Sequence, residues 1–264
     1  MNKRFVNVVI GGMGMRFSTT DPAFASMLER RYQGFAQHTG PHHFSFEVHL
    51  TPEGPVTPES DVSVRRQGNM WLLQRGDFHA TWYPRLRRGQ LRQTNNPYST
   101  DSVLRIVHSL VLASQQGFLL HASSAARNGK ALLFSGVSGA GKTTIISLAD
   151  AGSVLLTDEI SYVRRTRSGF CAFGTPFAGD LGKNGENISA PIETAFLLAK
   201  GPSNKTRELS KGEAIRRLMR NVLFFANDPS LIEAVWETVT RFVCQVVVKE
   251  LTFAPTPEVW DLIV

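Results

Sequence analysis

The segment GVSGAGKT at residues 136–143 limits the possible folds of this chain more tightly than any other stretch. It matches the pattern G-x-x-x-x-G-K-[ST], follows a strand-like run from Ala131 to Ser135, and opens a helix-like run. Glycines at this spacing let the backbone turn tightly, so that successive N–H groups surround a phosphate. The N-terminus of the helix adds partial positive charge. The segment therefore predicts a phosphate-binding loop within an α/β fold.

The polar residues of this loop have predicted tasks in holding a nucleoside triphosphate. The Lys142 ammonium can reach the β- and γ-phosphates, and the Thr143 hydroxyl can ligate Mg²⁺. Thr144 is the next residue of the helix. We therefore expect ATP with Mg²⁺ to be bound by the loop and the first helical turn, through Gly136, Ser138, Gly139, Ala140, Gly141, Lys142, Thr143 and Thr144.

The composition is that of a folded protein with anionic partners. Of the 264 residues, 42% are hydrophobic and 19% are charged, which allows a packed core. The formal charge of +7 favours nucleotides, nucleic acids or acidic peptides by long-range attraction. The basic run PRLRRGQLR at 84–92 has little aromatic interleaving and carries no nucleic-acid motif. We expect this run to be solvated surface, and we expect no nucleic-acid partner.

Cysteine usage and hydropathy point to a cytoplasmic protein. The two cysteines, Cys171 and Cys244, lack metal-ligand spacing and give no disulfide framework, which favours a reducing compartment. The sequence has no run of about 18 apolar residues, so no membrane partner is expected. The first stretch, MNKRFVNVVIGGMGM, lacks an A-x-A cleavage pattern, so we interpret it as a strand rather than a secretory signal.

The polar, turn-forming stretch QTNNPYST at 93–100 predicts a domain boundary near residue 98. Residues 1–98 alternate short apolar stretches with turn-rich spacers such as TPEGPVTPES, which indicates a small α+β domain with mostly antiparallel pairing. Asp21-Pro22 opens its predicted helix. Residues 99–264 form the predicted α/β domain. Its first helix, over 103–114, has Ser99 to Asp101 as expected caps.

The dipeptide Asn128-Gly129 predicts a tight hairpin just before the loop, because both residues tolerate positive φ. Counting outward from this turn brings His121 opposite Gly136, the first glycine of the loop. The hairpin therefore aims His121 at the phosphate-binding loop. The alternative is a satisfied strand histidine without a functional role.

Beyond the loop the pattern predicts a parallel βαβ unit, with a helix over 143–151 and a buried strand over 153–157. The rest of the chain predicts a strand at 194–198, an Arg-rich helix at about 211–226, a second helix at about 230–243 and a final strand at 245–253. Asp158 and Glu159 directly follow the buried strand. A carboxylate at that position can hold Mg²⁺ or accept a proton, and the alternative is a solvated acid at a strand end.

Three segments together resemble the kinase domain of HPr kinase/phosphorylase and the HPr kinase-related proteins, distant relatives of phosphoenolpyruvate carboxykinase. They are His121-Ala122, the loop GVSGAGKT, and LLTDE at 155–159. Weaker matches are GTPFAGD at 174–180 and LTFAPTPEVWDLI at 251–263. The resemblance covers roughly residues 100–264. It looks closest to the branch that includes kinases acting on the C-terminal serine of lasso-peptide precursors.

This resemblance implies a P-loop kinase domain of the HPr kinase/phosphoenolpyruvate carboxykinase type, preceded by the small α+β domain. It implies Asp158 as the catalytic base, His121 beside it, and Lys142 as the third catalytic residue. Thr143, Asp158 and Glu159 are the implied metal ligands. Relatives in this family form oligomers, so a homo-oligomer is compatible with the resemblance.

The sequence also departs from the pattern of the HPr kinases. Those enzymes carry Asp-Asp in place of Asp158-Glu159, and their loop usually ends in Lys-Ser rather than Lys142-Thr143. The later glycine- and arginine-rich signature of the reverse, phosphorylase reaction has no counterpart in this sequence. These departures argue against HPr as the substrate and against phosphorolysis.

The leading functional hypothesis is an ATP-dependent kinase that phosphorylates a hydroxyl, specifically a serine of a peptide or protein recognised with help from the N-terminal domain. The alternatives are a small-molecule kinase on the same scaffold and a nucleotide-dependent switch without phosphoryl transfer. Asp180 and Lys183 lie in a glycine-rich stretch and either contact the acceptor or lie on a solvated loop. One guanidinium on the γ-phosphate could come from Arg207, Arg216, Arg217 or Arg220, unless these form a solvated face.

Overall fold

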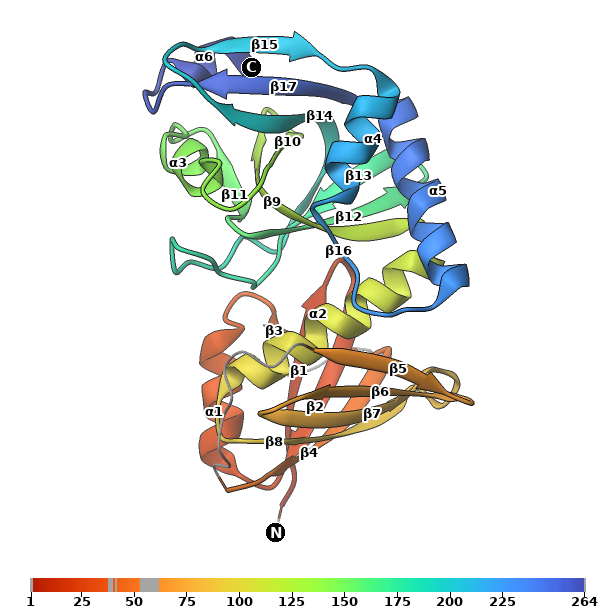
Figure 1. Cartoon of the computed structure of the whole chain (residues 1–264). Coiled ribbons are helices and arrows are strands. Elements are labelled where there is room, and N and C mark those ends of the chain that lie inside the picture. Colours follow the sequence, from red (N-terminus) through yellow and green to blue (C-terminus); the bar gives the residue numbers. More distant parts are fainter. Residues whose placement is uncertain (1, 38–39, 41, 53–61, 264) are drawn as a thin grey trace. The chain divides into compact units, whose positions relative to one another are not determined.

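The computed structural model describes residues 2–37, 40, 42–52 and 62–263. The protein is a mixed α/β structure with two sheets, and the chain divides into two compact units (Figure 1). One unit contains the chain up to Leu110 together with Phe224–Ile232, and the other contains Val111–Leu223 and the chain from Glu233 onward. Most of the spacer TPEGPVTPES at 51–60 lies outside the described residues.

The first unit contains a sheet of eight strands in the order β3-β1-β2-β4-β8-β7-β6-β5. Its pairing is antiparallel except between β2 and β4 and between β4 and β8. The predicted N-terminal strand and the mostly antiparallel pairing are therefore confirmed. The strands are Arg4–Ile10 (β1), Met13–Thr19 (β2), Ala36–Gln37 (β3), Phe44–Leu50 (β4), Ser63–Gln67 (β5), Met70–Arg75 (β6), Phe78–Tyr83 (β7) and Arg88–Gln93 (β8).

The helices near the first sheet begin at local caps. Helix α1 (Pro22–Arg31) starts after Asp21, whose side chain accepts a hydrogen bond from the Phe24 N–H, as predicted. A short 3₁₀ turn follows β7 at Pro84–Leu86. Helix α2 (Pro97–Ser114) begins earlier than predicted, because the Asn96 side chain accepts the Ser99 N–H at 3.1 Å. The expected caps at 99–101 therefore lie within its first turns.

The second unit contains nine strands in the order β10-β9-β12-β13-β14-β17-β15 (Figure 1). Strands β11 and β16 also pair with β9, and β14 returns to pair with β10, so that β10, β9, β12, β13 and β14 form a closed circuit of pairings. The strands are Gly117–Arg127 (β9), Lys130–Ser135 (β10), Val154–Thr157 (β11), Ile160–Thr166 (β12), Gly169–Phe173 (β13), Ser189–Lys200 (β14), Lys205–Glu208 (β15), Val222–Leu223 (β16) and Val247–Phe253 (β17).

The β9–β10 hairpin has the register that the sequence predicts. Pairing runs from Lys130 with Arg127 to Ser135 with Ala122, and the turn residues Asn128 and Gly129 both have positive φ. The predicted βαβ unit is present in modified form. Strands β10 and β11 run in the same direction, but antiparallel β9 lies between them because both pair with it.

The helices of the second unit are Lys142–Ser147 (α3), Lys211–Met219 (α4), Pro229–Gln245 (α5), which starts in the first unit, and Val259–Ile263 (α6). Helix α4 is shorter than the predicted 211–226, since the chain leaves it to form β16. Helix α6 was not predicted; its Trp260 Nε1–H donates to the Ile145 carbonyl of α3 at 2.9 Å. Among the described residues, no helix combines the length and apolar character that a membrane crossing requires.

Candidate active site

The predicted phosphate-binding loop connects the end of β10 to the start of α3. Gly139 and Gly141 have φ values of +72° and +103°, which residues with a Cβ rarely adopt. A Cβ added to Gly141 would also lie 2.7 Å from the Phe253 ring. The conformation of the loop therefore depends on the glycines of the motif, and Gly141 is needed for both backbone and packing reasons.

Lys142 lies in the interior of this loop, with 8% of its surface exposed. Its Nζ donates to the backbone carbonyls of Gly136 at 3.1 Å and Val137 at 3.3 Å. Burial lowers the pKa of Lys142, while the negative charges of Asp180 and Glu159 oppose that shift. The ammonium is thus a desolvated charge at the centre of the loop, where an anion would interact with it strongly.

A cavity of about 300 Å³ opens beside the loop. Every predicted catalytic residue and every predicted metal ligand lines it, and so do most of the predicted nucleotide-binding residues. Gly136 and Ala140 do not line it; Ala140 is buried and packs near Gly136. The lining consists of His121, Ser138, Gly139, Gly141, Lys142, Thr143, Thr144, Asp158, Glu159, Gly179 and Asp180.

Asp158 is buried at the end of β11 and is not the solvated strand-end acid of the alternative interpretation. Asp158 is only 2% exposed. Its carboxylate accepts two backbone hydrogen bonds of 2.8 Å, one from the Gly179 N–H to Oδ1 and one from the Leu181 N–H to Oδ2. Each carboxylate oxygen has a second lone pair for another partner. The two amides therefore orient this carboxylate at the wall of the cavity.

The glycine-rich stretch at 174–188 is attached to β11 by its backbone. Thr175 N–H donates to the Leu156 carbonyl at 3.0 Å, and Glu186 N–H donates to the Leu155 carbonyl at 2.8 Å. A Cβ on Gly185 would meet the Leu156 carbonyl oxygen at 1.7 Å, so only glycine permits this approach. The stretch is therefore an anchored wall of the site rather than the solvated loop that the sequence left open.

Asp180 is the residue of the site whose position sequence reasoning missed. It follows Gly179 in the anchored stretch, and its Oδ2 lies 3.4 Å from the Thr143 hydroxyl oxygen. From the sequence, Asp180 was expected either to contact the acceptor or to lie on a solvated loop. Lys183, considered with it, is exposed and does not line the cavity.

His121, on β9, and Glu159, in the bend between β11 and β12, are held through their backbones. His121 N–H donates to the Asn221 carbonyl at 2.7 Å, and the His121 carbonyl accepts the Ser135 hydroxyl at 3.0 Å. The Glu159 carbonyl accepts the Ala122 N–H at 3.0 Å. Both residues line the cavity.

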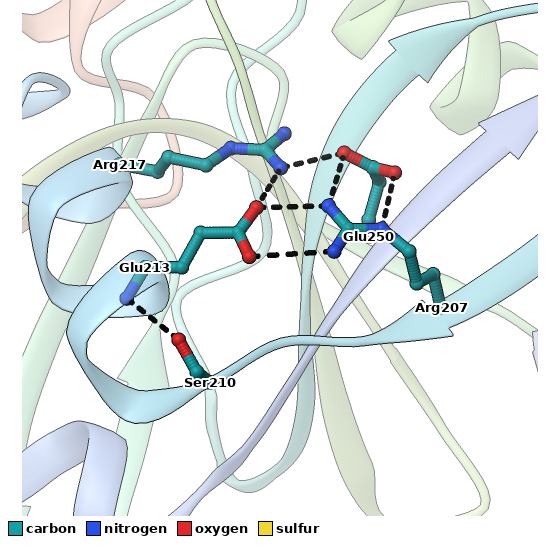
Figure 2. A network of polar contacts seen from close by, with 5 residues as sticks. All are labelled: Arg207, Ser210, Glu213, Arg217 and Glu250. Carbon is teal, nitrogen blue, oxygen red and sulfur yellow. Dashed lines mark hydrogen bonds and ion pairs between the residues drawn. The ribbon is translucent and has the colours of Figure 1, made fainter.

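The four arginines considered for the γ-phosphate do not line the cavity. Arg207 of β15 and Arg217 of α4 bind the carboxylates of Glu213 and Glu250 instead, and the Ser210 hydroxyl caps α4 in the same network (Figure 2). The Arg217–Glu250 contact is 2.6 Å. This network joins α4, β15 and β17, so we interpret it as structural.

The oxygen donors at the cavity suit Mg²⁺ bound together with a nucleotide. Among the described residues there is no cluster of three or more His, Cys, Asp or Glu side chains that could hold a metal alone. Nucleotide-bound Mg²⁺ does not need such a cluster, because it uses one or two protein oxygens, phosphate oxygens and water. The Thr143 hydroxyl and the acidic side chains of the cavity supply the protein oxygens.

Comparisons with known proteins give a family match and weak structural likenesses. No curated protein matches the sequence. A solved structure, "Structure of the Hpr(Ser) kinase/phosphatase from Coxiella burnetii", shares 13% identity with a TM-score of 0.26 and covers 47% of this chain and 90% of its own. A family model described as "SynChlorMet cassette protein ScmC" matches residues 93–239, more than half of the chain. The chain belongs to the SynChlorMet cassette protein ScmC family.

Proposed function

We propose that this protein is an ATP-dependent kinase that transfers the γ-phosphoryl group to a hydroxyl, specifically a serine of a peptide or protein. One observation carries the proposal. The phosphate-loop residues Ser138, Gly139 and Gly141 to Thr144 line a single cavity together with His121 and the acidic residues Asp158 and Glu159. The proposed polyphosphate site and Asp158, the candidate proton acceptor, therefore line the same cavity.

The loop side of the cavity would bind the nucleotide. Backbone N–H groups of the loop and the Lys142 ammonium would hold the β- and γ-phosphates, with Thr143 and an acidic neighbour holding Mg²⁺. When bound, Mg²⁺ offsets negative charge on the phosphate oxygens. Lys142 would exchange its contacts with the Gly136 and Val137 carbonyls for contacts with phosphate oxygens. After such an exchange the buried Lys142 ammonium would still have hydrogen-bond partners.

The strand side of the cavity would serve the acceptor. The acceptor oxygen attacks the γ-phosphorus, the bond to the β–γ bridging oxygen breaks, and ADP leaves with that electron pair. Asp158 takes the hydroxyl proton, with its carboxylate held in place by the two loop amides. His121 orients the hydroxyl. Transfer of this kind depends on alignment and on neutralised charge more than on covalent chemistry by the protein.

A peptide or protein acceptor fits two features of the chain. The formal charge of +7 attracts acidic peptides, and a separate compact unit without the phosphate loop is available for recognition. The resemblance of His121-Ala122, GVSGAGKT and LLTDE to kinases of peptide precursors points to the same acceptor class.

The test combines calorimetry with Mg-ATP and transfer assays with γ-labelled ATP. The acceptors would be a set of peptides ending in serine and, separately, a pool of small metabolites. We expect Lys142→Ala to abolish nucleotide binding and Asp158→Asn to abolish transfer while ATP still binds. Lys183→Ala is the matched control, because Lys183 is exposed and lies outside the cavity lining.

The outcomes separate the alternatives. Label in the small-molecule fraction would identify a small-molecule kinase, and tight ATP binding without any labelled product would identify a nucleotide-dependent switch. The absence of measurable heat with Mg-ATP would overturn the nucleotide site itself. Turnover near that of the wild type in Asp158→Asn would remove Asp158 from the role of base.

A further inference from the structure

Asp180 faces Thr143 across the mouth of the phosphate-binding loop. The two residues come from the anchored stretch at 174–188 and from the first turn of α3. The Asp180 Oδ2 and the Thr143 Oγ1 are 3.4 Å apart. This separation exceeds the roughly 2.7–2.8 Å of a good O–H···O hydrogen bond. The direct contact between the two groups is therefore weak.

The separation suits two ligands of one small cation. Two oxygens at adjacent positions of an octahedral Mg²⁺, each about 2.0–2.1 Å from the metal, are about 2.9 Å apart. A side-chain rotation of Asp180 would close the difference, and its exposure leaves it room to move. Asp158 has no such freedom, because it is buried and both its oxygens are already held by backbone amides.

Electrostatics also favour a cation at this point. Three carboxylates, those of Asp158, Glu159 and Asp180, line the cavity that would receive the nucleotide phosphates. Like charges repel one another, and a cation bound among them would offset this repulsion. Asp180 lines the same cavity as Lys142 and the other loop residues, so its charge lies beside the proposed phosphate site. Lys142 alone cannot offset three carboxylates and a polyphosphate.

Asp158 controls the position of Asp180 through the backbone. Its carboxylate binds the N–H groups of Gly179 and Leu181, the residues on either side of Asp180. Gly179 allows this contact, because a Cβ there would lie 3.1 Å from the Asp158 Oδ2 and 3.0 Å from the Glu159 Cβ. The buried carboxylate of Asp158 thus holds the backbone on both sides of Asp180, and this fixes the position from which the exposed Asp180 side chain extends.

We propose that Asp180, together with the Thr143 hydroxyl, ligates the Mg²⁺ that accompanies the nucleotide, and that Asp158 holds Asp180 in position through Gly179 and Leu181. This inference rests on the nucleotide binding proposed above. It differs from the sequence-based metal ligands in assigning the carboxylate ligand to Asp180 rather than to Asp158 or Glu159.

The experiment measures the affinity for ADP by calorimetry, in EDTA and in Mg²⁺, for the wild type and for Asp180→Asn. We expect the metal-free affinity to be retained or increased in Asp180→Asn, and the enhancement by Mg²⁺ to fall about tenfold or more. Lys183→Ala is the control that should keep the enhancement, because Lys183 is exposed and lies outside the cavity lining. A second variant, Asp180→Cys, should regain metal-enhanced ADP binding with Cd²⁺ and not with Mg²⁺, because a thiolate prefers soft cations.

Hydrogen exchange tests the positioning role of Asp158. In Asp158→Asn the amide group can accept from one of the two N–H groups but not from both, so the Gly179 or Leu181 amide should exchange faster. Asp180→Asn should leave both amides protected. Undiminished enhancement by Mg²⁺ in Asp180→Asn would overturn the inference while ADP binding persists. A wild type that binds no ADP in either condition would instead contradict the proposed function.

Discussion

The hydroxyl of Ser123 donates a hydrogen bond of 3.0 Å to the backbone carbonyl of Lys142, and both residues are buried. Ser123 belongs to β9, two residues from His121, whereas Lys142 begins α3. The contact therefore ties the strand that carries one candidate catalytic residue to the helix that carries the lysine proposed to bind phosphate. It helps to hold β9 and α3, which β10 and the loop separate in the sequence, at a fixed distance.

Ser123→Ala should lower the free energy of unfolding by about 1 kcal/mol, because it removes a buried hydrogen bond and leaves a carbonyl without that donor. Chemical denaturation with urea would measure the change. Ser147→Ala is the matched control: the Ser147 hydroxyl also donates to a backbone carbonyl, that of Thr144, but it is exposed to water. Equal losses in the two variants would contradict the role of the buried contact.

Gly141→Ala should destabilise the protein more than Gly129→Ala. Both glycines have positive φ, so each substitution costs roughly 1–2 kcal/mol of backbone strain. At Gly129 a Cβ meets nothing within 4 Å, whereas at Gly141 it would press on the Phe253 ring at 2.7 Å. Thermal denaturation would rank the two variants. Calorimetry with ADP should show loss of binding in Gly141→Ala and retained binding in Gly129→Ala.

Trp260→Phe should destabilise the contact between α6 and α3. The indole N–H donates to the Ile145 carbonyl at 2.9 Å, and the indole ring packs edge-on against Phe134 at 5.6 Å between centroids. Phenylalanine keeps the apolar contact and loses the donor, so we expect a loss of about 1 kcal/mol in unfolding free energy. Urea denaturation would measure it. Trp236→Phe, at a half-exposed position, should be close to neutral and serves as the control.

Local signals in the sequence were enough for the strand, loop and helix around the phosphate site. Asn128 and Gly129 fixed the turn, and a fixed turn sets the register of every following pair. The motif glycines then fixed the backbone of the loop, since the positive φ values of Gly139 and Gly141 are a local requirement. These features could be predicted because the forces that determine them act between residues close in the chain.

The position of Asp180 could not be predicted in the same way. It depends on hydrogen bonds that the Asp158 carboxylate accepts from backbone N–H groups 21 and 23 residues further along, within a stretch that has no periodic pattern. The pairing of Arg217 with Glu250 spans 33 residues and has no local signal either. A basic helix looks the same in sequence whether its charges are solvated or bound to distant carboxylates, so the arginine network became visible only in the fold.

The stability of the second unit should depend on Glu250 in acid. Hydrogen bonds from Arg207 and then from Arg217 lower the pKa of Glu250 from 4.5 to about 2 (Figure 2). The unfolded chain therefore takes up a proton at higher pH than the folded protein, so the contribution of the Glu250 charge to stability is complete above about pH 5 and is lost as the pH falls towards 2.

The variant Glu250→Gln lacks this charge and its contribution to stability. We expect the stability difference between wild type and Glu250→Gln, measured by urea denaturation, to be largest near neutral pH and to shrink below pH 5. Glu208→Gln, with its side chain 82% exposed, should show little difference at any pH. A gap between wild type and Glu250→Gln that stays constant from pH 7 to pH 3 would mean that the Glu250 charge does not stabilise the folded state.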